Sequence, residues 1–196
     1  MTLRSESAPE VRRSPSVVLR YPRIEDGPEY LRLRRDNATY LAPWEPATPP
    51  AIDPFGPAAF VALLNQARTE RRHGLLVTAA RDDTIMGALN INEIVHGCFQ
   101  SAYLGYWLGS EYVGHGHMTE ALRLGLDFAF RDLALHRVEA NIMPRNGRSL
   151  ATIQRVGFSR EGYSPRYLRI AGQWEDHERW ALTREDWTER PRGQIG

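Results

Sequence analysis

The segment Ala102–Arg131, AYLGYWLGSEYVGHGHMTEALRLGLDFAFR, decides how this chain folds. Tyr103 to Leu108 is a short aromatic and apolar run, which is typical of a buried strand. Gly109 to Gly114 is rich in turn residues, and Gly116 to Phe130 repeats apolar residues at helical spacing. The segment therefore predicts a strand, a glycine turn and a helix in succession.

The start of this predicted helix lacks a conventional N-cap. Val113 to His117 contains no Ser, Thr, Asp or Asn, so the first backbone amides have no side-chain partner in the sequence. The two glycines, Gly114 and Gly116, let another group approach the backbone closely. Because the N-terminus of a helix attracts anions, Gly114-His115-Gly116 is a candidate pyrophosphate cradle, and a turn capped by water is the alternative.

Composition limits the class of protein. The 196 residues are 42% hydrophobic with a net charge of +1, which predicts one soluble domain without a membrane span. A single cysteine suits a reducing compartment, so we expect the protein in the cytoplasm. Balanced charge argues against a protein that mainly grips nucleic acid, and the single Cys98 excludes an internal disulfide. We expect a flexible arm over residues 1–16, the domain over 17–187 and a flexible tail over 188–196.

The N-terminal half predicts helices, a hairpin and a long loop. The expected elements are a strand at Val17–Tyr21, a helix ending near Asn37, a helix near Ala58–Arg72, and a hairpin of Leu75–Ala80 with Ile85–Ile94. Six of the 13 prolines fall between Pro43 and Pro57, so this stretch is neither a regular helix nor a central strand. Such a long loop is either a binding loop or a surface wrap whose aromatic residues fill the core.

The C-terminal half predicts a parallel strand pair. His136 to Met143 alternates apolar and polar residues as a strand does, and it follows the central strand and helix, so the pair is parallel with a right-handed crossover. Asn146 and Gly157 are suited to cap a helix over Gly147 to Val156, and two further strands lie within Tyr163 to Leu182. The fold class is therefore mixed α/β, with a mostly antiparallel sheet.

The glycine turn resembles the cofactor loop of the GNAT superfamily of N-acetyltransferases, whose pattern is Gln/Arg-x-x-Gly-x-Gly/Ala. The corresponding residues run from Val113 to Met118, VGHGHM, and differ from that pattern at both ends. Four longer segments resemble the RimJ/RimL branch of this family and most closely its ribosomal-protein alanine type: LAPWEP, LGYWLGSEYVGHGHMTEAL, ANIMPRNGRSLATIQRVGFSREGY and YLRIAGQWEDH. The resemblance as a whole covers the chain from about Val17 to Trp187.

The resemblance implies a single GNAT-like domain in which the central parallel strands splay apart to hold acetyl-CoA. The implied contacts are backbone amides for the pyrophosphate, strand-edge groups and asparagines for the pantetheine arm, and no metal. The residues concerned are Tyr106, Trp107, Leu108, Val113, Gly114, His115, Gly116, His117, Met118, Asn141, Asn146 and Ser149. Without the resemblance, the preferred explanation of Trp107 and Leu108 is as core strand residues, and that of Asn146 is as a plain helix cap.

The resemblance also implies roles in catalysis. Ser149 occupies the position of the hydroxyl that protonates the leaving thiolate. The resemblance assigns no general base, because Arg166 stands where RimL-type enzymes have a Glu; Glu93, at the end of a strand, and Glu45, on the proline-rich loop, are alternative candidates. An N-terminal α-amine, with a pKa of about 7.7 to 8.0, needs little help from a base. The acceptor site is expected to include Tyr40, Trp44, Glu45 and Glu93.

Two classes of function follow from these observations. The first is an N-acetyltransferase that acts on a protein N-terminus, or on a small amine such as a drug or polyamine. The second is a ribosome assembly factor that binds CoA without turnover. The Ser149 hydroxyl and the open glycine turn favour the enzyme. We expect it to use acetyl-CoA as co-substrate and to transfer the acetyl group by direct attack in a ternary complex. The protein is expected to be either a monomer or a homodimer.

Overall fold

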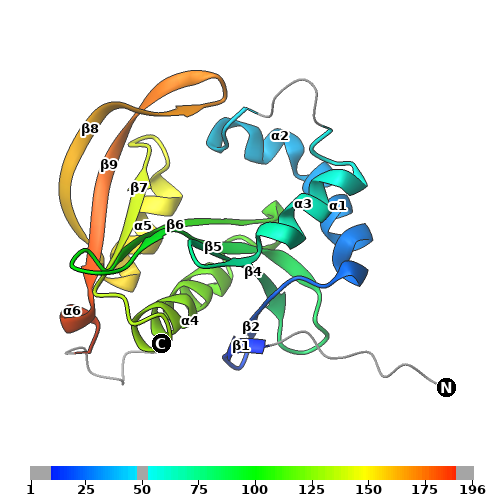
Figure 1. The fold of residues 1–196 in the computed structure, drawn as a ribbon. Coiled ribbons are helices and arrows are strands. Elements are labelled where there is room, and N and C mark those ends of the chain that lie inside the picture. The colour runs from blue at the N-terminus through cyan, green and yellow to red at the C-terminus, as the bar shows by residue number, and fades with distance from the viewer. Residues whose placement is uncertain (1–9, 48–52, 189–196) are drawn as a thin grey trace.

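The computed structural model describes residues 10–47 and 53–188, which form one twisted sheet with helices on both faces (Figure 1). The sheet order is β1-β2-β4-β5-β6-β7-β9-β8, and the short β3 pairs with β4. The strands are β1 Glu10–Arg13, β2 Val17–Arg20, β3 Arg68–Thr69, β4 Arg72–Ala79, β5 Ile85–Val95, β6 Ser101–Leu108, β7 Arg137–Ile142, β8 Ser159–Ile170 and β9 Gln173–Thr183. The helices are α1 Gly27–Asp36, α2 Ala38–Leu41, α3 Pro57–Gln66, α4 His117–Arg131, α5 Gly147–Val156 and α6 Arg184–Thr188, with 3-10 turns η1 Ile24–Asp26, η2 Ala42–Trp44 and η3 Ser110–Tyr112.

Among the strands of the described residues, only β6 and β7 run parallel, and α4 connects them, as the sequence predicted. The two strands pair over three residues on each side, Ser101–Tyr103 with Arg137–Glu139. Beyond Tyr103 they diverge, so the rest of β6 has an edge that β7 does not cover. This confirms the predicted mixed, mostly antiparallel sheet with a splayed parallel pair at its centre.

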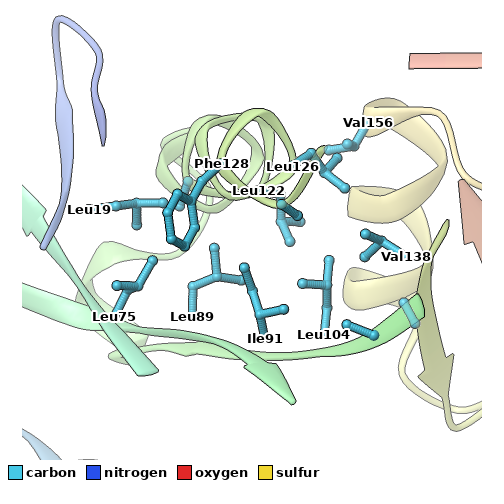
Figure 2. Packing of buried hydrophobic residues seen from close by; sticks show 14 of the residues in the cluster. Leu19, Leu75, Leu89, Ile91, Leu104, Leu122, Leu126, Phe128, Val138 and Val156 are labelled. Atoms are coloured by element: carbon cyan, nitrogen blue, oxygen red, sulfur yellow. The ribbon is translucent and has the colours of Figure 1, made fainter. Parts of the chain in front are cut away.

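The main core lies between the sheet and α4. In Figure 2, Leu89, Ile91 and Leu104 of the sheet point toward Leu122 and Leu126 of the helix. Gly125 lets the helix lie close to the strands, because a Cβ there would overlap Leu89 Cδ2. The close packing of α4 fixes the place where the glycine turn begins the helix.

The opposite face of the sheet carries a smaller core under α1 and α3. Tyr30 and Leu33 of α1 and Phe60 of α3 pack on Leu76 and Ile85 of the sheet. Leu75 and Leu76 therefore face opposite cores, as alternation along a strand requires. The sheet is covered on both sides, and a ligand can reach β6 only where the strands separate.

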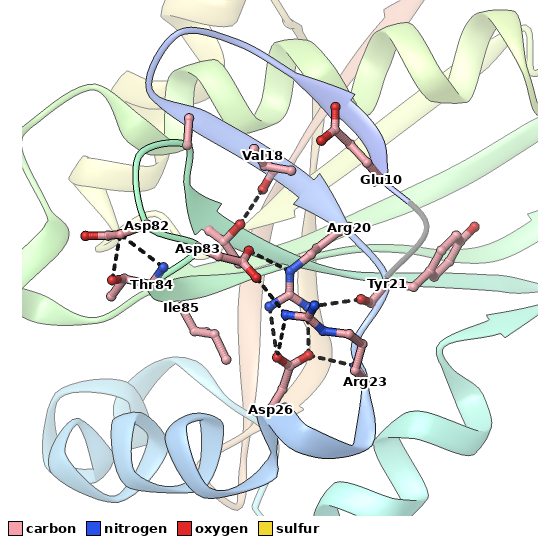
Figure 3. A network of polar contacts seen from close by, with 12 residues as sticks. Glu10, Val18, Arg20, Tyr21, Arg23, Asp26, Asp82, Asp83, Thr84 and Ile85 are labelled. Atoms are coloured by element: carbon pink, nitrogen blue, oxygen red, sulfur yellow. Dashed lines mark hydrogen bonds and ion pairs between the residues drawn. The ribbon is translucent and has the colours of Figure 1, made fainter. Parts of the chain in front are cut away.

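A buried ion-pair cluster ties the first helix to the sheet (Figure 3). Arg20 donates two hydrogen bonds to the carboxylate of Asp26, at 2.7 and 2.9 Å, and its Nε donates to Asp83 at 2.7 Å. Arg23 donates to the other oxygen of Asp83 at 2.6 Å. Arg20 is 4% exposed and Asp26 5%, so each charge has a partner that offsets its loss of water.

The structure corrects two boundaries. Glu10–Arg13, expected within a flexible arm, form β1, and Arg12 reaches across to Asp127 on α4 with a 2.9 Å hydrogen bond. The helix expected near Ala58–Arg72 ends at Gln66, because the chain turns sharply and Arg68–Thr69 pair with β4. The first correction involves a contact distant in sequence, and the second a tight hairpin between neighbouring residues.

The late hairpin, formed by β8 and β9, extends beyond the rest of the sheet and curves toward α2 (Figure 1). Its two strands are joined by a turn at Ala171-Gly172, and the backbone amide of Ala171 donates to the carbonyl of Glu45 at 2.9 Å. The hairpin thus contacts the proline-rich loop, of which residues 48–52 lie outside the described part of the chain. None of the helices over residues 10–47 and 53–188 has the length and apolar character to span a bilayer.

Candidate active site

The glycine turn forms an open backbone cradle at the start of α4. Gly114 has φ +91° and Gly116, the N-cap, has φ +84°, a left-handed conformation that favours glycine. Within the described residues, no side chain hydrogen-bonds to the helix start as a cap, and a Cβ at either glycine would meet nothing within 4 Å. The open backbone matches the predicted anion cradle and would accommodate a diphosphate.

The cradle opens into a cleft of about 580 Å³ between the separated strands and α5. The cleft brings together most of the residues that the sequence singled out. These are Tyr40, Trp44, Tyr106, Trp107, Leu108, Val113, Gly114, Gly116, His117, Met118, Asn146 and Ser149. His115, Asn141, Glu45 and Glu93 are not part of its lining.

Two hydroxyl groups meet inside the cleft. Tyr106 of β6 and Ser149 of α5 share a hydrogen bond of 2.6 Å between Oη and Oγ. Burial raises the pKa of Tyr106 to about 12, an effect that the hydrogen bond to Ser149 only partly offsets. Tyr106 is therefore a neutral phenol at physiological pH.

The start of α5 holds Ser149 in place. The side chain of Asn146 accepts a 3.2 Å hydrogen bond from the Ser149 amide, which confirms the predicted N-cap. Gly157 ends the helix with φ +104°, also as predicted. Both ends of α5 are thus fixed by the residues that the sequence indicated, and Ser149 is presented from a rigid helix.

Asn141 lies just beyond the point where the parallel strands separate. Among the described residues, its buried Oδ1 has no hydrogen-bond partner, which is unusual for a buried amide. The amide groups of a pantetheine arm could supply that missing donor, and His117 Nδ1 is similarly buried without a partner. These unpaired atoms, together with the open cradle, fit the binding of a CoA molecule.

Glu45 is held in an ion pair outside the cleft lining. Arg34 donates to both of its carboxylate oxygens, at 2.6 and 2.7 Å, and lies 4.9 Å over the ring of Trp107. Because both oxygens are already occupied, the structure does not favour Glu45 as a general base. Its neighbour Trp44 does line the cleft, beneath Arg145, which pairs with Glu175 of β9 at 2.6 Å.

Glu93, the other candidate base, is not brought to the cleft. It occupies the irregular stretch of β5 between Asn92 and Val95, with φ +49°, and pairs with Arg71 at the surface at 2.5 Å. Its side chain is 63% exposed. The register pairs Asn92 with Tyr103, whereas the cleft begins at Tyr106, so Glu93 lies toward the opposite end of β6.

The two histidines of the glycine turn lie beside each other, with ring centroids 5.9 Å apart. His117 lines the cleft and His115 does not. Over the described ranges, no group of three or more His, Cys, Asp and Glu side chains gathers in a way that could hold a metal ion.

Several basic residues of the cleft were missed from the sequence. Arg145, Arg148 and Arg155 all contribute to its lining. Arg148 and Arg155 are two helical turns apart on α5, and this spacing is the signal that could have identified them. Together they make one wall of the cleft basic.

Comparison with known proteins agrees with this geometry. The family described as "Acetyltransferase (GNAT) domain" matches residues 16–159. The chain is 38% identical to the [Ribosomal protein uS5]-alanine N-acetyltransferase of Escherichia coli over 157 residues, which are 78% of this chain and 80% of that protein. It is 40% identical over 119 residues to the probable N-acetyltransferase YjcK of Bacillus subtilis, covering 61% of this chain and 65% of that protein.

Among solved structures, the chain is similar to Mycobacterium smegmatis RimJ in complex with CoA-disulfide. The TM-score is 0.81 at 35% identity, with 87% of this chain and 83% of that chain covered. These matches confirm the family resemblance, the fold and the enzyme class that the sequence suggested.

Proposed function

The chain belongs to the GNAT acetyltransferase family, and from this premise we propose that it transfers acetyl from acetyl-CoA to the α-amine of a protein N-terminus. A ribosomal protein that begins with alanine is the acceptor we propose, by similarity to the uS5-alanine N-acetyltransferase of Escherichia coli. The observation that carries the proposal is the open cradle of Gly114 and Gly116 beside a cleft that contains two hydroxyl groups.

The residues of the cleft account for the binding of acetyl-CoA. Backbone amides from Val113 to Met118 would hold the pyrophosphate at the positive end of α4. The uncovered edge of β6 at Trp107 and Leu108 would bind the pantetheine amides as a sheet edge binds a peptide. Asn141 Oδ1 and the amide group of Asn146 offer further partners to the same arm.

The acceptor would reach the same cleft from the side of α2 and the late hairpin. Tyr40 and Trp44 line the cleft there, and Arg145 and Glu175 hold Trp44 against the hairpin. These contacts make the wall rigid and largely aromatic, which suits a small N-terminal side chain.

The chemistry that we propose requires little base catalysis. The cleft lining contains no Asp or Glu among the described residues, so the α-amine of the acceptor loses its proton mainly to solvent before it attacks. An α-amine with a pKa of about 7.7 to 8.0 is substantially neutral at cellular pH, whereas a lysine would cost roughly 4 kcal/mol to neutralise. A backbone amide near Tyr106 to Leu108 would stabilise the developing oxyanion, and Ser149 would protonate the departing sulfur.

The acceptor class is tested by thiol release from acetyl-CoA with matched peptides. We expect turnover with a peptide that begins with a free alanine, and none after its N-terminus is blocked while an internal lysine stays free. Turnover with polyamines and not with the peptide would instead indicate a small-amine acetyltransferase. Tight CoA binding without turnover of any acceptor would indicate an assembly factor.

Direct transfer is tested by steady-state kinetics. We expect initial-rate lines that intersect when acetyl-CoA and the peptide are both varied, because attack in a ternary complex needs both substrates bound. Parallel lines, together with a protein that is heavier by the mass of one acetyl group, about 42 Da, would instead show that the enzyme itself becomes acetylated. Intact-mass analysis of ribosomal proteins from cells with and without the chain would then identify the acceptor.

A further inference from the structure

We propose that Tyr106 is the source of the proton that Ser149 delivers to the departing sulfur, so that the two hydroxyls act as a relay. This inference rests on the proposed function, since it concerns the same transfer from acetyl-CoA. Tyr106 acts through Ser149 and is in this sense a positioning residue.

The relay is built from two rigid elements. Tyr106 comes from β6 and Ser149 from the first turn of α5, and their oxygens are 2.6 Å apart. The strand is paired with β5 on one side, and the helix is capped by Asn146. The backbone is therefore held in place at both residues, and the hydrogen bond joins their side chains.

The direction of the hydrogen bond follows from acidity. A phenol is a stronger acid than an aliphatic alcohol, so Tyr106 is the better donor and Ser149 the better acceptor. No other hydrogen bond to Ser149 Oγ is found in the described chain, and its own proton is free to point into the cleft. Thr152 in the same helix behaves differently, because its hydroxyl donates back to the carbonyl of Arg148 at 2.8 Å.

The pair lies where the reactive end of the ligand would be. Leu108, Trp107 and Tyr106 all line the cleft, and they lie successively farther along β6 from the strand end that leads into the glycine turn. A ligand with its diphosphate in the cradle and its arm along β6 would therefore bring its thioester toward Tyr106 and Ser149. Because burial raises the pKa of Tyr106 to about 12, the pair keeps both protons throughout the physiological range.

The proposed step is balanced in protons and electrons. The acceptor nitrogen forms a bond to the acetyl carbon, the carbon–sulfur bond breaks, and its electron pair stays on sulfur. The Ser149 proton passes to sulfur to give the free thiol, and the Tyr106 proton passes to Ser149 Oγ. The nitrogen of the new amide loses one proton, which restores the phenol of Tyr106 directly or through water.

The first measurement is the ionisation of bound CoA, which requires no acceptor. In the wild type, donation from the pair to sulfur should lower the thiol pKa of bound CoA below that of free CoA, as followed by thiolate ultraviolet absorbance. Tyr106→Phe and Ser149→Ala should each raise it again by about one unit. A merely structural role for Tyr106 would leave this value unchanged.

The second measurement is turnover with the alanine peptide. Ser149→Ala should lower kcat about 100-fold and Tyr106→Phe about 10-fold, and the double variant should be no slower than Ser149→Ala alone, because the residues act as one unit. The KM for acetyl-CoA should stay within about two-fold. Fluorotyrosine at position 106, a more acidic phenol of nearly the same shape, provides a second probe that should lower the thiol pKa further.

Tyr21→Phe is the matched control. Tyr21 is a buried tyrosine that also makes a short side-chain hydrogen bond, 2.5 Å to His73 Nδ1, but it lies just after β2 and does not line the cleft. Tyr21→Phe should lower the free energy of unfolding about as much as Tyr106→Phe does, and it should keep the wild-type kcat and the wild-type thiol pKa of bound CoA. A thiol pKa that is the same in wild type, Tyr106→Phe and fluorotyrosine protein would overturn the relay, even if the peptide is acetylated. A shifted thiol pKa without peptide turnover would support the relay and count against the proposed acceptor.

Discussion

At the scale of single residues, the cleft presents hydroxyl groups and backbone amides, whereas the two candidate carboxylates pair with arginines outside its lining. Glu45 is held by Arg34 and Glu93 pairs with Arg71. The cleft lining itself has no carboxylate among the described residues. The pH dependence of the reaction should therefore be that of the acceptor and not of a protein carboxylate.

The first prediction is a rate profile set by the acceptor amine. We expect kcat/KM to rise with pH up to the amine pKa of about 8 and then to level off. The plateau has no alkaline decline from Tyr106, whose pKa is about 12, within the range in which the protein stays folded. The measurement is kcat/KM against pH for two peptides whose N-terminal amines differ in basicity, and the midpoint should move with the amine. A midpoint that stays fixed at about pH 5 to 6 for both peptides would instead indicate a carboxylate base, because that is the range of a Glu whose pKa the protein has raised.

A second prediction at this scale concerns Arg34. Its guanidinium makes two hydrogen bonds to Glu45 and stacks on Trp107, and a lysine cannot reproduce either contact. Arg34→Lys should lower the free energy of unfolding by about 1 kcal/mol and raise the KM for the peptide several-fold. Urea denaturation and steady-state kinetics provide the two readouts.

Arg71→Lys is the control for Arg34→Lys. Arg71 also pairs with a glutamate, but the two side chains are 72% and 63% exposed. Its substitution should change stability by less than about 0.5 kcal/mol. Equal losses in the two variants would show that the bidentate contact has no special value.

At the scale of secondary-structure elements, the glycine turn determines the geometry of the cradle. Gly116 keeps φ +84° at the N-cap, where an L side chain is strained even though space is available. Gly116→Ala should favour a negative φ that turns the amides away from the ligand. The cost of about 1 to 2 kcal/mol on binding corresponds to roughly a ten-fold increase in the Kd of CoA, which calorimetry would measure.

Gly97→Ala is the control that separates the strain of a side chain at a positive φ from the loss of CoA binding. Gly97 has φ +74° and open space around it, but it lies in the turn between β5 and β6, outside the cleft lining. It should lose a similar amount of stability and bind CoA as the wild type does. Loss of CoA affinity in both variants would mean that general destabilisation, and not the cradle, is responsible.

The elements themselves were largely predictable from local sequence, because their signals are local. The glycine turn, α4 and the Asn146 and Gly157 caps of α5 all depend on residues within a few positions of one another. The end of α3 and the existence of β1 depend instead on short hairpins, in which Arg68–Thr69 pair with the start of β4 and Glu10–Arg13 pair with β2. These strands have two and four residues and are largely exposed, so they carry too few apolar residues for an alternating pattern to reveal them.

The candidate site shows the same division. The cleft residues from Tyr106 to Met118 follow one another along the chain, so one motif indicated most of them. The positions of Glu45 and Glu93 depend on Arg34 and Arg71 and on an irregular stretch of β5. The contact between Tyr106 and Ser149 joins residues 43 positions apart, and no sequence pattern predicted it.

At the scale of the whole molecule, the ion-pair cluster of Figure 3 links β2, η1 and the turn between β4 and β5. Burial alone would raise the pKa of Asp83, but hydrogen bonds from Arg20 and Thr78 and the charge of Arg20 outweigh it, so the pKa lies below its usual value. A carboxylate with a depressed pKa in the folded state stabilises the fold above its unfolded pKa of about 3.9. That stability is lost as the pH falls through the folded pKa.

The corresponding prediction is a change in acid stability. Asp83→Asn should reduce the free energy of unfolding at pH 7 by about 1 kcal/mol, a value discounted because the Asp83 side chain is 44% exposed. Asn tolerates the left-handed φ of +62° at this position, so the change tests charge more than backbone strain. Between about pH 5 and pH 2 the variant should lose less stability than the wild type in urea titrations.

Asp36→Asn is the control for acid stability. Asp36 is an exposed residue at the end of α1, and its substitution should shift stability by less than about 0.5 kcal/mol at any pH. The proposed role of the cluster would be wrong if Asp83→Asn and the wild type showed the same slope with pH.

Because the first amides of α4 have no side-chain cap, the melting temperature of the protein should report whether a ligand is bound there. Any molecule that binds the native state and not the unfolded state raises the melting temperature. At a hundred times its Kd, such a ligand adds about 2.7 kcal/mol. A simple melting screen of adenosine diphosphates, pantetheine fragments and intact CoA would thus rank which portion of the coenzyme the protein holds most firmly, with no acceptor in the tube.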